Sequence, residues 1–441
     1  MTLPHASMSK TSPKNRNRWR ILWAVVVGLF VVLLAVAAFG IVFLKRSVVD
    51  YRADHDFSIR DPAFFGSAHA LADPPPLEGN SVKLLHNGDQ IFPALIEAIQ
   101  SAKASINFEA FLFDSDEVGA RFRDALCERA QAGVRVRVLL DGIGSGAAFS
   151  DADEATFRRA GCTFAYYHPT RSWRVDKMNR RTHRRILVVD GKVGFTGSVG
   201  FAKLWVGNAD SPEHWRDVHV RLEGPIVGKL QGAFQQHWVR ATGETISGAA
   251  EFPPLPPGGK LRTQLIASHS FSVSPLSLVQ AVAFASAEKT IFITNSYCVP
   301  SHNQVTLLTK AAARGVDVRL LVPGRHNDQP MTKSAGRGAY GDLLEGGVKI
   351  FEYEPTMIHT KSIVVDGIFA VIGSSNFDSR SAQINEELDI TVYDEGFGAE
   401  MDGVFQGDLK SSKPYRLEDF KKRSAWERFS EWIVAPLSPL L

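Results

Sequence analysis

Cysteine is scarce in this sequence, and several common binding motifs are missing. The 441 residues include three cysteines, Cys127, Cys162 and Cys298, which lie far apart and form no C-x-x-C pair. This pattern argues against a structural zinc site and gives no disulfide framework. The sequence also lacks a glycine-rich nucleotide-binding loop, a dinucleotide fingerprint and a cluster of metal-ligating residues. We therefore expect the protein to use no metal and no cofactor.

Net charge is nearly absent as well. The formal charge is +3, and the chain is 44% hydrophobic and 22% charged, which is ordinary for a protein with buried cores. The length is too great for one small domain. Whole-chain charge therefore says little about partners, and the local patterns must be examined instead.

One long stretch lacks charge completely. Residues 21–44 are apolar throughout, and a helix of that length crosses a bilayer core of roughly 30 Å. More basic residues precede this stretch than follow it, which places the basic tail of residues 1–20 in the cytoplasm. A cleaved signal peptide is the alternative, but the apolar run is longer than the usual core of such a peptide. We predict one transmembrane helix over residues 21–44, with the remainder of the chain on the outer side of the membrane.

Two proline-rich stretches divide the rest of the chain. They predict a juxtamembrane linker over residues 45–78, a first half over 79–250, a Pro/Gly linker over 251–260 and a second half over 261–441. The halves repeat each other in order: "AGVRVRVLLDG" in the first corresponds to "RGVDVRLLVPG" in the second, and "GAFQ" to "GVFQ". Apolar strands alternate with helical patterns in each half. The predicted fold is a duplicated α/β fold.

A nine-residue motif occurs once in each half. The first copy reads "HRRILVVDG" from His183, and the second reads "HTKSIVVDG" from His359. Side chains two positions apart on a strand share a face, so His183 should project with Arg185, and His359 with Lys361. The spacing of roughly 6–7 Å suits one phosphoryl group, with the imidazole beside phosphorus and the cation on an oxygen.

Two such pairs facing one pocket predict a phosphodiester exchange. One histidine acts as the nucleophile and forms a phosphohistidine, while the other protonates the leaving alcohol. We assign His183 as the nucleophile and His359 as the acid. The aspartates that end the motifs, Asp190 and Asp366, are candidates for the catalytic set, but an Asp-Gly pair between apolar runs is also a strong hairpin signal.

The second copy extends into a longer pattern, H-x-K-x4-D-x6-G-S-x-N. Its positions are His359, Lys361, Asp366, Gly373, Ser374 and Asn376. The chain thereby resembles the phospholipase D superfamily, and "GVKIFEYEPTMIHTKSIVVDG" and "GSSNFDSRSAQINEELDI" are most similar to bacterial cardiolipin synthases. The resemblance implies two tandem phospholipase D-like α/β sandwich halves that build one active site where they meet.

The resemblance also implies roles for further residues. Ser374, Asn376 and Glu387 would support the phosphate and the second histidine, and Ser198 of the first half would also bind the substrate. The first half departs from the pattern, with Arg185 in place of lysine and Gly200 in place of asparagine. Arginine keeps the charge and can bind two phosphate oxygens at once. We therefore expect a working first motif that holds its phosphate differently.

The function implied is that of a cardiolipin synthase in the inner membrane of a bacterium. Such an enzyme transfers a phosphatidyl group from one phosphatidylglycerol to another and releases glycerol. Its partners would be anionic phospholipids and the membrane, and the predicted anchor argues against nucleic acid. Hydrolysis of phospholipid, a nuclease-type phosphodiesterase activity and a non-catalytic lipid-binding role are the alternatives.

An aromatic pattern lies near the C-terminus. Trp426, Phe429 and Ile433 have helical spacing, and Trp432 lies beside them. Such a helix could dock at a membrane interface. We favour the other interpretation, in which it packs on the second half.

Overall fold

The computed structural model describes residues 19–32, 51, 53–146, 148–169, 179–270, 273–435 and 438. The chain divides into two units, Met1–Asp50 and Tyr51–Leu441. The first unit contains a helix over residues 19–32. The predicted membrane helix begins within it, and residues 33–44 lie outside the described part. None of the helices described in the chain combines the length and the apolar character needed to cross a membrane.

The second unit contains two copies of one α/β arrangement. The first copy comprises β1 (Leu77–His86), α3 (Asn87–Ser101), β2 (Ser105–Ala110), α4 (Glu117–Gln131), β3 (Arg135–Asp141), α5 (Asp151–Arg159), β4 (Thr163–Tyr167), β5 (Ile186–Val189), β6 (Val193–Gly197), η1 (Lys203–Trp205), β7 (Val218–Glu223) and α7 (Ile226–Thr242).

The second copy repeats this order with a few additions. It comprises β8 (Leu261–Ala267), α8 (Pro275–Ser286), β9 (Thr290–Asn295), β10 (Cys298–Val299), α9 (His302–Ala313), β11 (Asp317–Pro323), α10 (Pro330–Arg337), α11 (Tyr340–Glu345), β12 (Lys349–Tyr353), β13 (Lys361–Val365), β14 (Phe369–Gly373), β15 (Phe377–Asp378), α12 (Ser379–Gln383), β16 (Leu388–Tyr393), α13 (Glu395–Leu409), β17 (Ser412–Tyr415), α14 (Leu417–Lys421) and α15 (Ala425–Val434).

One sheet of 15 strands runs through both copies. Its order is β17-β12-β11-β9-β13-β14-β16-β8-β1-β7-β6-β5-β2-β3-β4. Read outward from the central pair of β8 and β1, the two sides follow the same sequence of equivalent strands. The halves are joined by the antiparallel pairing of β1 with β8. The duplicated, mixed α/β fold predicted from the sequence is confirmed.

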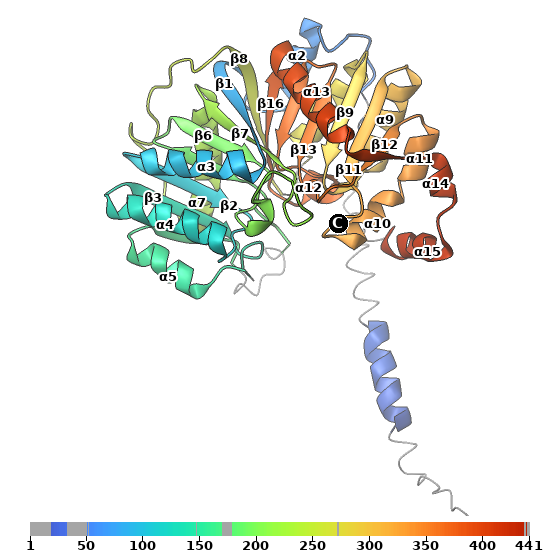
Figure 1. The fold of residues 1–441 in the computed structure, drawn as a ribbon, viewed down its shortest axis with the longest axis horizontal. Coiled ribbons are helices and arrows are strands. Elements are labelled where there is room, and N and C mark those ends of the chain that lie inside the picture. Colours follow the sequence, from blue (N-terminus) through green and yellow to red (C-terminus); the bar gives the residue numbers. More distant parts are fainter. Residues whose placement is uncertain are drawn as a thin grey trace, which may run out of the picture. The chain divides into compact units, whose positions relative to one another are not determined.

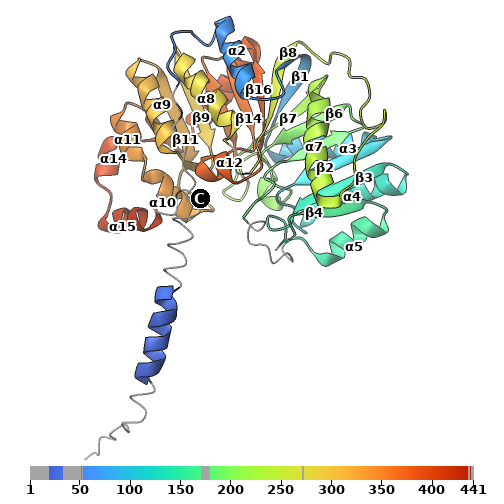
Figure 2. The same cartoon turned by 180° about the vertical axis from the view of Figure 1, so that it is seen from behind.

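Helices cover both faces of this sheet (Figures 1 and 2). In the first half, α3 and α4 cover the face seen in Figure 1 and α7 covers the opposite face. In the second half, α13 covers the face seen in Figure 1, and α8 and α9 cover the face seen in Figure 2. A core under α7 and α13 joins the halves, with Val220 and Phe234 of the first and Leu265 and Ile390 of the second. This shared core fixes the halves against each other.

The repeated motif forms the predicted hairpin in each half. β5 pairs antiparallel with β6, and β13 with β14. Asp190 and Gly191 have φ values of 51° and 63°, and Asp366 and Gly367 have 52° and 63°. Positive φ at both central residues is the geometry that favours Asp-Gly in a tight hairpin. The strand itself begins only at Ile186 in the first half, so His183 lies just before it.

The predicted juxtamembrane linker of residues 45–78 contains the helix α2 (Pro62–Leu71). The side chain of Phe64 in this helix is fully buried and packs edge-on against Phe369, with ring centroids 5.8 Å apart. Residues before β1 therefore contribute to the core of the second half.

The C-terminal helix α15 does not bury its aromatic side chains, contrary to the packing that we favoured. Trp426 is 73% exposed and Trp432 is 71% exposed. Only Val434 of this helix is buried. The helix contacts the protein through Val434, which packs with Val299 and Ala335, and through an ion pair of Glu427 with Arg337.

Candidate active site

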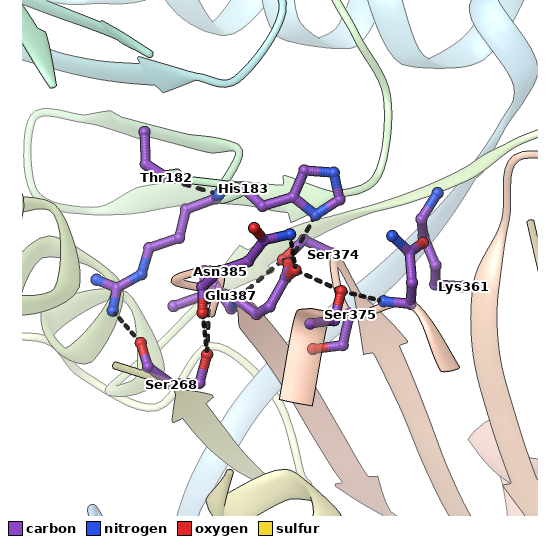
Figure 3. Close-up of polar contacts among 12 residues, drawn as sticks. Thr182, His183, Ser268, Lys361, Ser374, Ser375, Asn385 and Glu387 are labelled. Atoms are coloured by element: carbon purple, nitrogen blue, oxygen red, sulfur yellow. Dashed lines mark hydrogen bonds and ion pairs between the residues drawn. The ribbon is translucent and has the colours of Figure 1, made fainter. Parts of the chain in front are cut away.

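The first histidine is held by a carboxylate from the other half. His183 lies just before β5 and is buried, and its Nδ1 is 2.8 Å from Oε2 of Glu387, just before β16. Figure 3 shows the imidazole directed at this carboxylate, which also accepts hydrogen bonds from Ser374 Oγ at 2.6 Å and Asn385 Nδ2 at 3.2 Å. Because the carboxylate accepts a hydrogen bond from Nδ1–H, it selects the tautomer in which Nε2 carries no proton.

The second histidine is held in the same way by the first half. His359 Nδ1 is 3.0 Å from Oδ2 of Asp217, just before β7. The other carboxylate oxygen accepts from Ser198 Oγ at 2.5 Å. The indole N–H of Trp205 donates to Oδ2 at 2.9 Å. Asp217 is completely buried. Each half therefore supplies the carboxylate that orients the histidine of the other half.

Backbone hydrogen bonds fix this exchange. The amide of His183 donates to the carbonyl of Glu386 at 2.9 Å, and the amide of His359 donates to the carbonyl of Arg216 at 2.7 Å. Single β-bridges join Thr182 to Glu386 and Arg216 to Ile358. The expectation that Glu387 supports the second histidine is therefore wrong, since its carboxylate contacts the first.

Asp217 was not identified from the sequence. A signal for it exists, because Asp217 and Glu387 both stand directly before the strand that pairs with the second strand of the motif hairpin, in "RDVHVRLEG" and "EELDITVYD". Finding it requires an alignment of the two halves on their strands, since the surrounding letters differ.

The two cations of the motifs lie differently. Lys361 Nζ donates to Ser296 Oγ at 2.6 Å and is 3.0 Å and 3.2 Å from the two ring nitrogens of His359. Near-equal distances to both nitrogens place the ammonium over the face of the ring. Lys361 also donates to the carbonyl of His359 at 2.8 Å, and Arg185 likewise donates to the carbonyls of His183 and Val199. Both cations are buried.

The two motifs form one electrostatic unit. Burial and the Arg185 guanidinium lower the pKa of His183 to about 4, and Lys361 of the other half adds to the effect. Burial and the Lys361 ammonium lower the pKa of His359 to about 3, and Arg185 adds to it. Burial also lowers the pKa of Lys361 to about 7. Both imidazoles are therefore neutral at pH 7 in the unliganded protein, and each is sensitive to an added anion.

At Gly200, the side chain of Trp205 takes the place of the asparagine expected from the motif. A Cβ at this position would lie 2.6 Å from the Trp205 ring, so the indole fills the space that an asparagine would take. The same indole donates to Asp217. In the second half, Asn376 occupies the corresponding position, and its Oδ1 has no hydrogen-bond partner among the described residues. The first half thus uses an indole N–H on its carboxylate, and the second half keeps an amide oxygen available for another partner.

Asp190 and Asp366 do not belong to the cluster of histidines. The Asp190 carboxylate accepts hydrogen bonds from the amides of Lys103, Ala104 and Ser105 at 2.7–2.9 Å, at the start of β2. Asp366 accepts from the three equivalent amides of residues 288–290 at 2.7–2.8 Å, at the start of β9. Their inclusion in the catalytic set is corrected: they lie at the hairpin ends of β5 and β13, and the histidines lie at the other ends.

A second buried network supports the first motif and was also missed. His237 of α7 lies between two carboxylates, with Nδ1 2.6 Å from Glu109 and Nε2 2.6 Å from Glu386. Glu109 also accepts from the hydroxyl of Thr182 at 2.5 Å. The Thr182 hydroxyl in turn accepts the amide of Arg184 at 3.3 Å, so this network holds the backbone on both sides of His183. Nothing in the helical pattern of "GAFQQHW" distinguishes this histidine from a surface residue.

The fold and the cluster together define a class of protein: a duplicated α/β chain whose two histidine motifs are completed by carboxylates exchanged between the halves. A family model described as "Cardiolipin synthase, PLD-like domain" matches this chain twice, over residues 95–238 and 281–409. The chain belongs to this phospholipase D-like family of cardiolipin synthases.

Individual relatives agree with this assignment. Cardiolipin synthase 1 of Bacillus cereus is 33% identical over 378 residues, which cover 83% of this chain and 74% of the relative. Cardiolipin synthase A of Pseudomonas syringae is 32% identical and covers 84% of this chain and 77% of its own length. The crystal structure of phosphatidylserine synthase from Haemophilus influenzae has the same fold, with a TM-score of 0.64 at 13% identity, and covers 86% of this chain and all of its own.

Proposed function

We propose that the protein is a cardiolipin synthase that joins two phosphatidylglycerol molecules and releases glycerol, without a metal or a cofactor. The observation that carries this proposal is the pair of buried imidazoles, each with Nδ1 on a carboxylate of the opposite half. That arrangement leaves two Nε2 atoms for chemistry on one phosphorus, as a two-step exchange requires. The similarity to curated cardiolipin synthases supports phosphatidylglycerol as the substrate.

In the first step, Nε2 of His183 attacks phosphorus of one phosphatidylglycerol. The bond from phosphorus to the oxygen of the head-group glycerol breaks, and His359 gives that oxygen a proton, so that glycerol leaves. In the second step, the terminal hydroxyl of another phosphatidylglycerol loses its proton to His359 and attacks the phosphohistidine. The P–N bond breaks, and His183 is regenerated with its lone pair.

The contacts of the cations support these roles. The Lys361 ammonium touches the ring of His359, which makes the imidazolium form of this histidine the stronger acid. Arg185 donates to the carbonyl of His183, and not to its ring. The bound phosphodiester adds a negative charge between the cations, raises the pKa of His359 and so lets it carry the proton. Arg185 and Lys361 then hold the non-bridging oxygens, with Asn376 as a further polar contact.

The proposed setting is the inner membrane of a bacterium. Residues 21–44 form a single anchor, residues 1–20 lie in the cytoplasm, and the catalytic region, with halves over 79–250 and 261–441, lies on the outer side. The apolar run and the basic residues before it support this topology. The substrates are anionic phospholipids of that membrane.

The test is to reconstitute the purified full chain with phosphatidylglycerol and to identify the products by mass spectrometry. We expect cardiolipin and glycerol in equal amounts. Phosphatidic acid as the only lipid product would show that water is the acceptor and would refute the transferase proposal. His183→Ala and His359→Ala should each abolish product, whereas His302→Ala, at an exposed position on α9, should retain full activity.

A further inference from the structure

Helix α15 is oriented opposite to an ordinary surface helix, with its acidic side chains against the protein. Glu431 pairs with Arg423 and is only 10% exposed. Glu427 accepts the amide of Ser424 at 2.8 Å and lies 3.5 Å from Arg337 of α10. A helix on a globular surface normally buries its apolar side and exposes its charges. These ion pairs, together with the packing of Val434 against Val299 and Ala335, hold α15 with its aromatic side outward.

The outward side of α15 is aromatic. Phe429 lies between the two exposed tryptophans, with ring centroids 5.8 Å from Trp426 and 6.2 Å from Trp432. Ile433 is 49% exposed, and Met331 of the adjoining helix α10 is 51% exposed. We call these five residues the α10–α15 surface. The other exposed large apolar side chains among described residues 51–438 occur singly, at Ile143, Phe252 and Val273.

This surface is connected to the candidate site through one side chain. The ring of Tyr297 lies 5.4 Å from Lys361 Nζ and 5.9 Å from the ring of His359, measured between ring centroids in the second case. Its hydroxyl donates to Asp328 at 2.8 Å, and α10 begins two residues later. Figures 1 and 2 show α10, α12 and α15 along the same edge of the second half. The aromatic surface therefore lies at the edge from which the site is built.

We propose that the α10–α15 surface inserts into the interface of an anionic phospholipid bilayer and holds the site against the lipid. Indole rings favour the boundary between head groups and acyl chains. Exposed Lys421, Lys422 and Arg428 flank the aromatic side chains and match the charge of anionic head groups. The inference rests on the proposed function, because a phosphatidylglycerol substrate is what brings a bilayer to this edge.

A fluorescent label on α15 tests the contact directly. Ala425→Cys places a thiol on the exposed side of the helix without removing an aromatic residue, and the three native cysteines are buried. Ala399→Cys is the matched control, an exposed alanine on α13. Its neighbour Gly398 packs against Gly367, at the hairpin end opposite the histidines. The full chain is labelled with a polarity-sensitive fluorophore and reconstituted in phosphatidylglycerol–phosphatidylcholine vesicles, with or without nitroxide-bearing lipid.

We expect nitroxide lipid to quench the label at position 425 strongly and the label at 399 weakly. Equal quenching at the two positions would overturn the proposal. A label at 425 that is shielded from aqueous iodide but not quenched by the lipid would also overturn it. That result would show that protein covers α15, either a second copy or residues 436–441.

The effect on turnover provides a second arm. A double variant that carries both Trp426→Gln and Trp432→Gln should turn over phosphatidylglycerol in vesicles about threefold more slowly or worse, because it lacks the two indoles that would be buried at the interface. Turnover of a short-chain phosphatidylglycerol dispersed in detergent should be unchanged, and Phe252→Gln should change neither rate. Equal loss in both assays would contradict the membrane role of these side chains. If the wild-type chain forms no cardiolipin, the proposed function fails, while quenching at 425 still reports the bilayer contact.

Discussion

The exchange of carboxylates between the halves can be tested at Asp217, because other groups donate hydrogen bonds to both of its carboxylate oxygens. Oδ1 accepts from Ser198 and from the amide of Val218, and Oδ2 accepts from Trp205 and lies against His359. Asp217→Asn conserves the shape but replaces one acceptor oxygen by an NH2 group. In one orientation this group faces the indole N–H, and in the other it faces the amide of Val218.

The substitution should lower both the stability of the protein and its catalytic rate, and the structure indicates the size of each loss. A buried donor left without an acceptor costs about 1–3 kcal/mol of stability. If the NH2 group faces His359, the imidazole must accept at Nδ1 and carry its proton at Nε2, the wrong tautomer for taking up a proton in the second step. A comparable tautomer change in another enzyme class lowers kcat about 10⁴-fold, so we expect a loss on the order of 10²–10⁴-fold.

The assay is cardiolipin formation from phosphatidylglycerol, with the folded fraction of each variant established by thermal unfolding. Asp389→Asn is the matched control, because Asp389 is also buried and accepts from Ser375. Burial raises the pKa of Asp389 to about 7, so an amide replaces a carboxyl that is already substantially protonated, and we expect less than about a twofold change. Near wild-type turnover in Asp217→Asn would falsify the role assigned to the exchanged carboxylates.

Three further predictions concern the motifs themselves. Asp190→Ala and Asp366→Ala should each lower the free energy of unfolding by about 1–3 kcal/mol, since three amides lose their acceptor, while kcat of the folded protein stays constant; a selective loss of kcat would return these residues to the catalytic set. Gly200→Asn should destabilise the protein by about 1–3 kcal/mol in thermal or urea unfolding, because its Cβ would meet the Trp205 ring at 2.6 Å; a gain in stability would contradict the packing described. The rate of cardiolipin formation should fall as the pH rises above about 7, because Lys361 then loses its charge. In Lys361→Arg the maximal rate should be lower but this alkaline decline should disappear, because arginine keeps its charge. If the decline stays unchanged in the variant, a group other than Lys361 causes it.

Local patterns predicted most of the fold. The Asp-Gly pairs, the alternation of strands and helices and the order of repeated segments depend on neighbouring residues, and they gave the hairpins and the duplication. The histidines were found because the repeat placed a cation two positions after each of them.

The contacts between the halves could not be predicted in the same way. Glu387 was identified but paired with the wrong histidine, because a single motif does not show which half its carboxylate faces. Trp205 was missed because its role depends on the empty volume above Gly200, which exists only once the loop is folded. The aromatic side of α15 was expected to pack inward. Its orientation instead depends on Val434, which packs with Val299 and Ala335, and on ion pairs of Glu427 and Glu431 with side chains outside the helix.

The exchange of carboxylates has a consequence for how such a chain can change over generations. His183 depends on Glu387 and His359 depends on Asp217. Each pair of residues that selection must keep together therefore contains one residue from each repeat. A substitution that harms one carboxylate impairs the histidine of the opposite repeat. The two repeats therefore cannot be inherited or recombined as independent modules, although each has its own strands and helices.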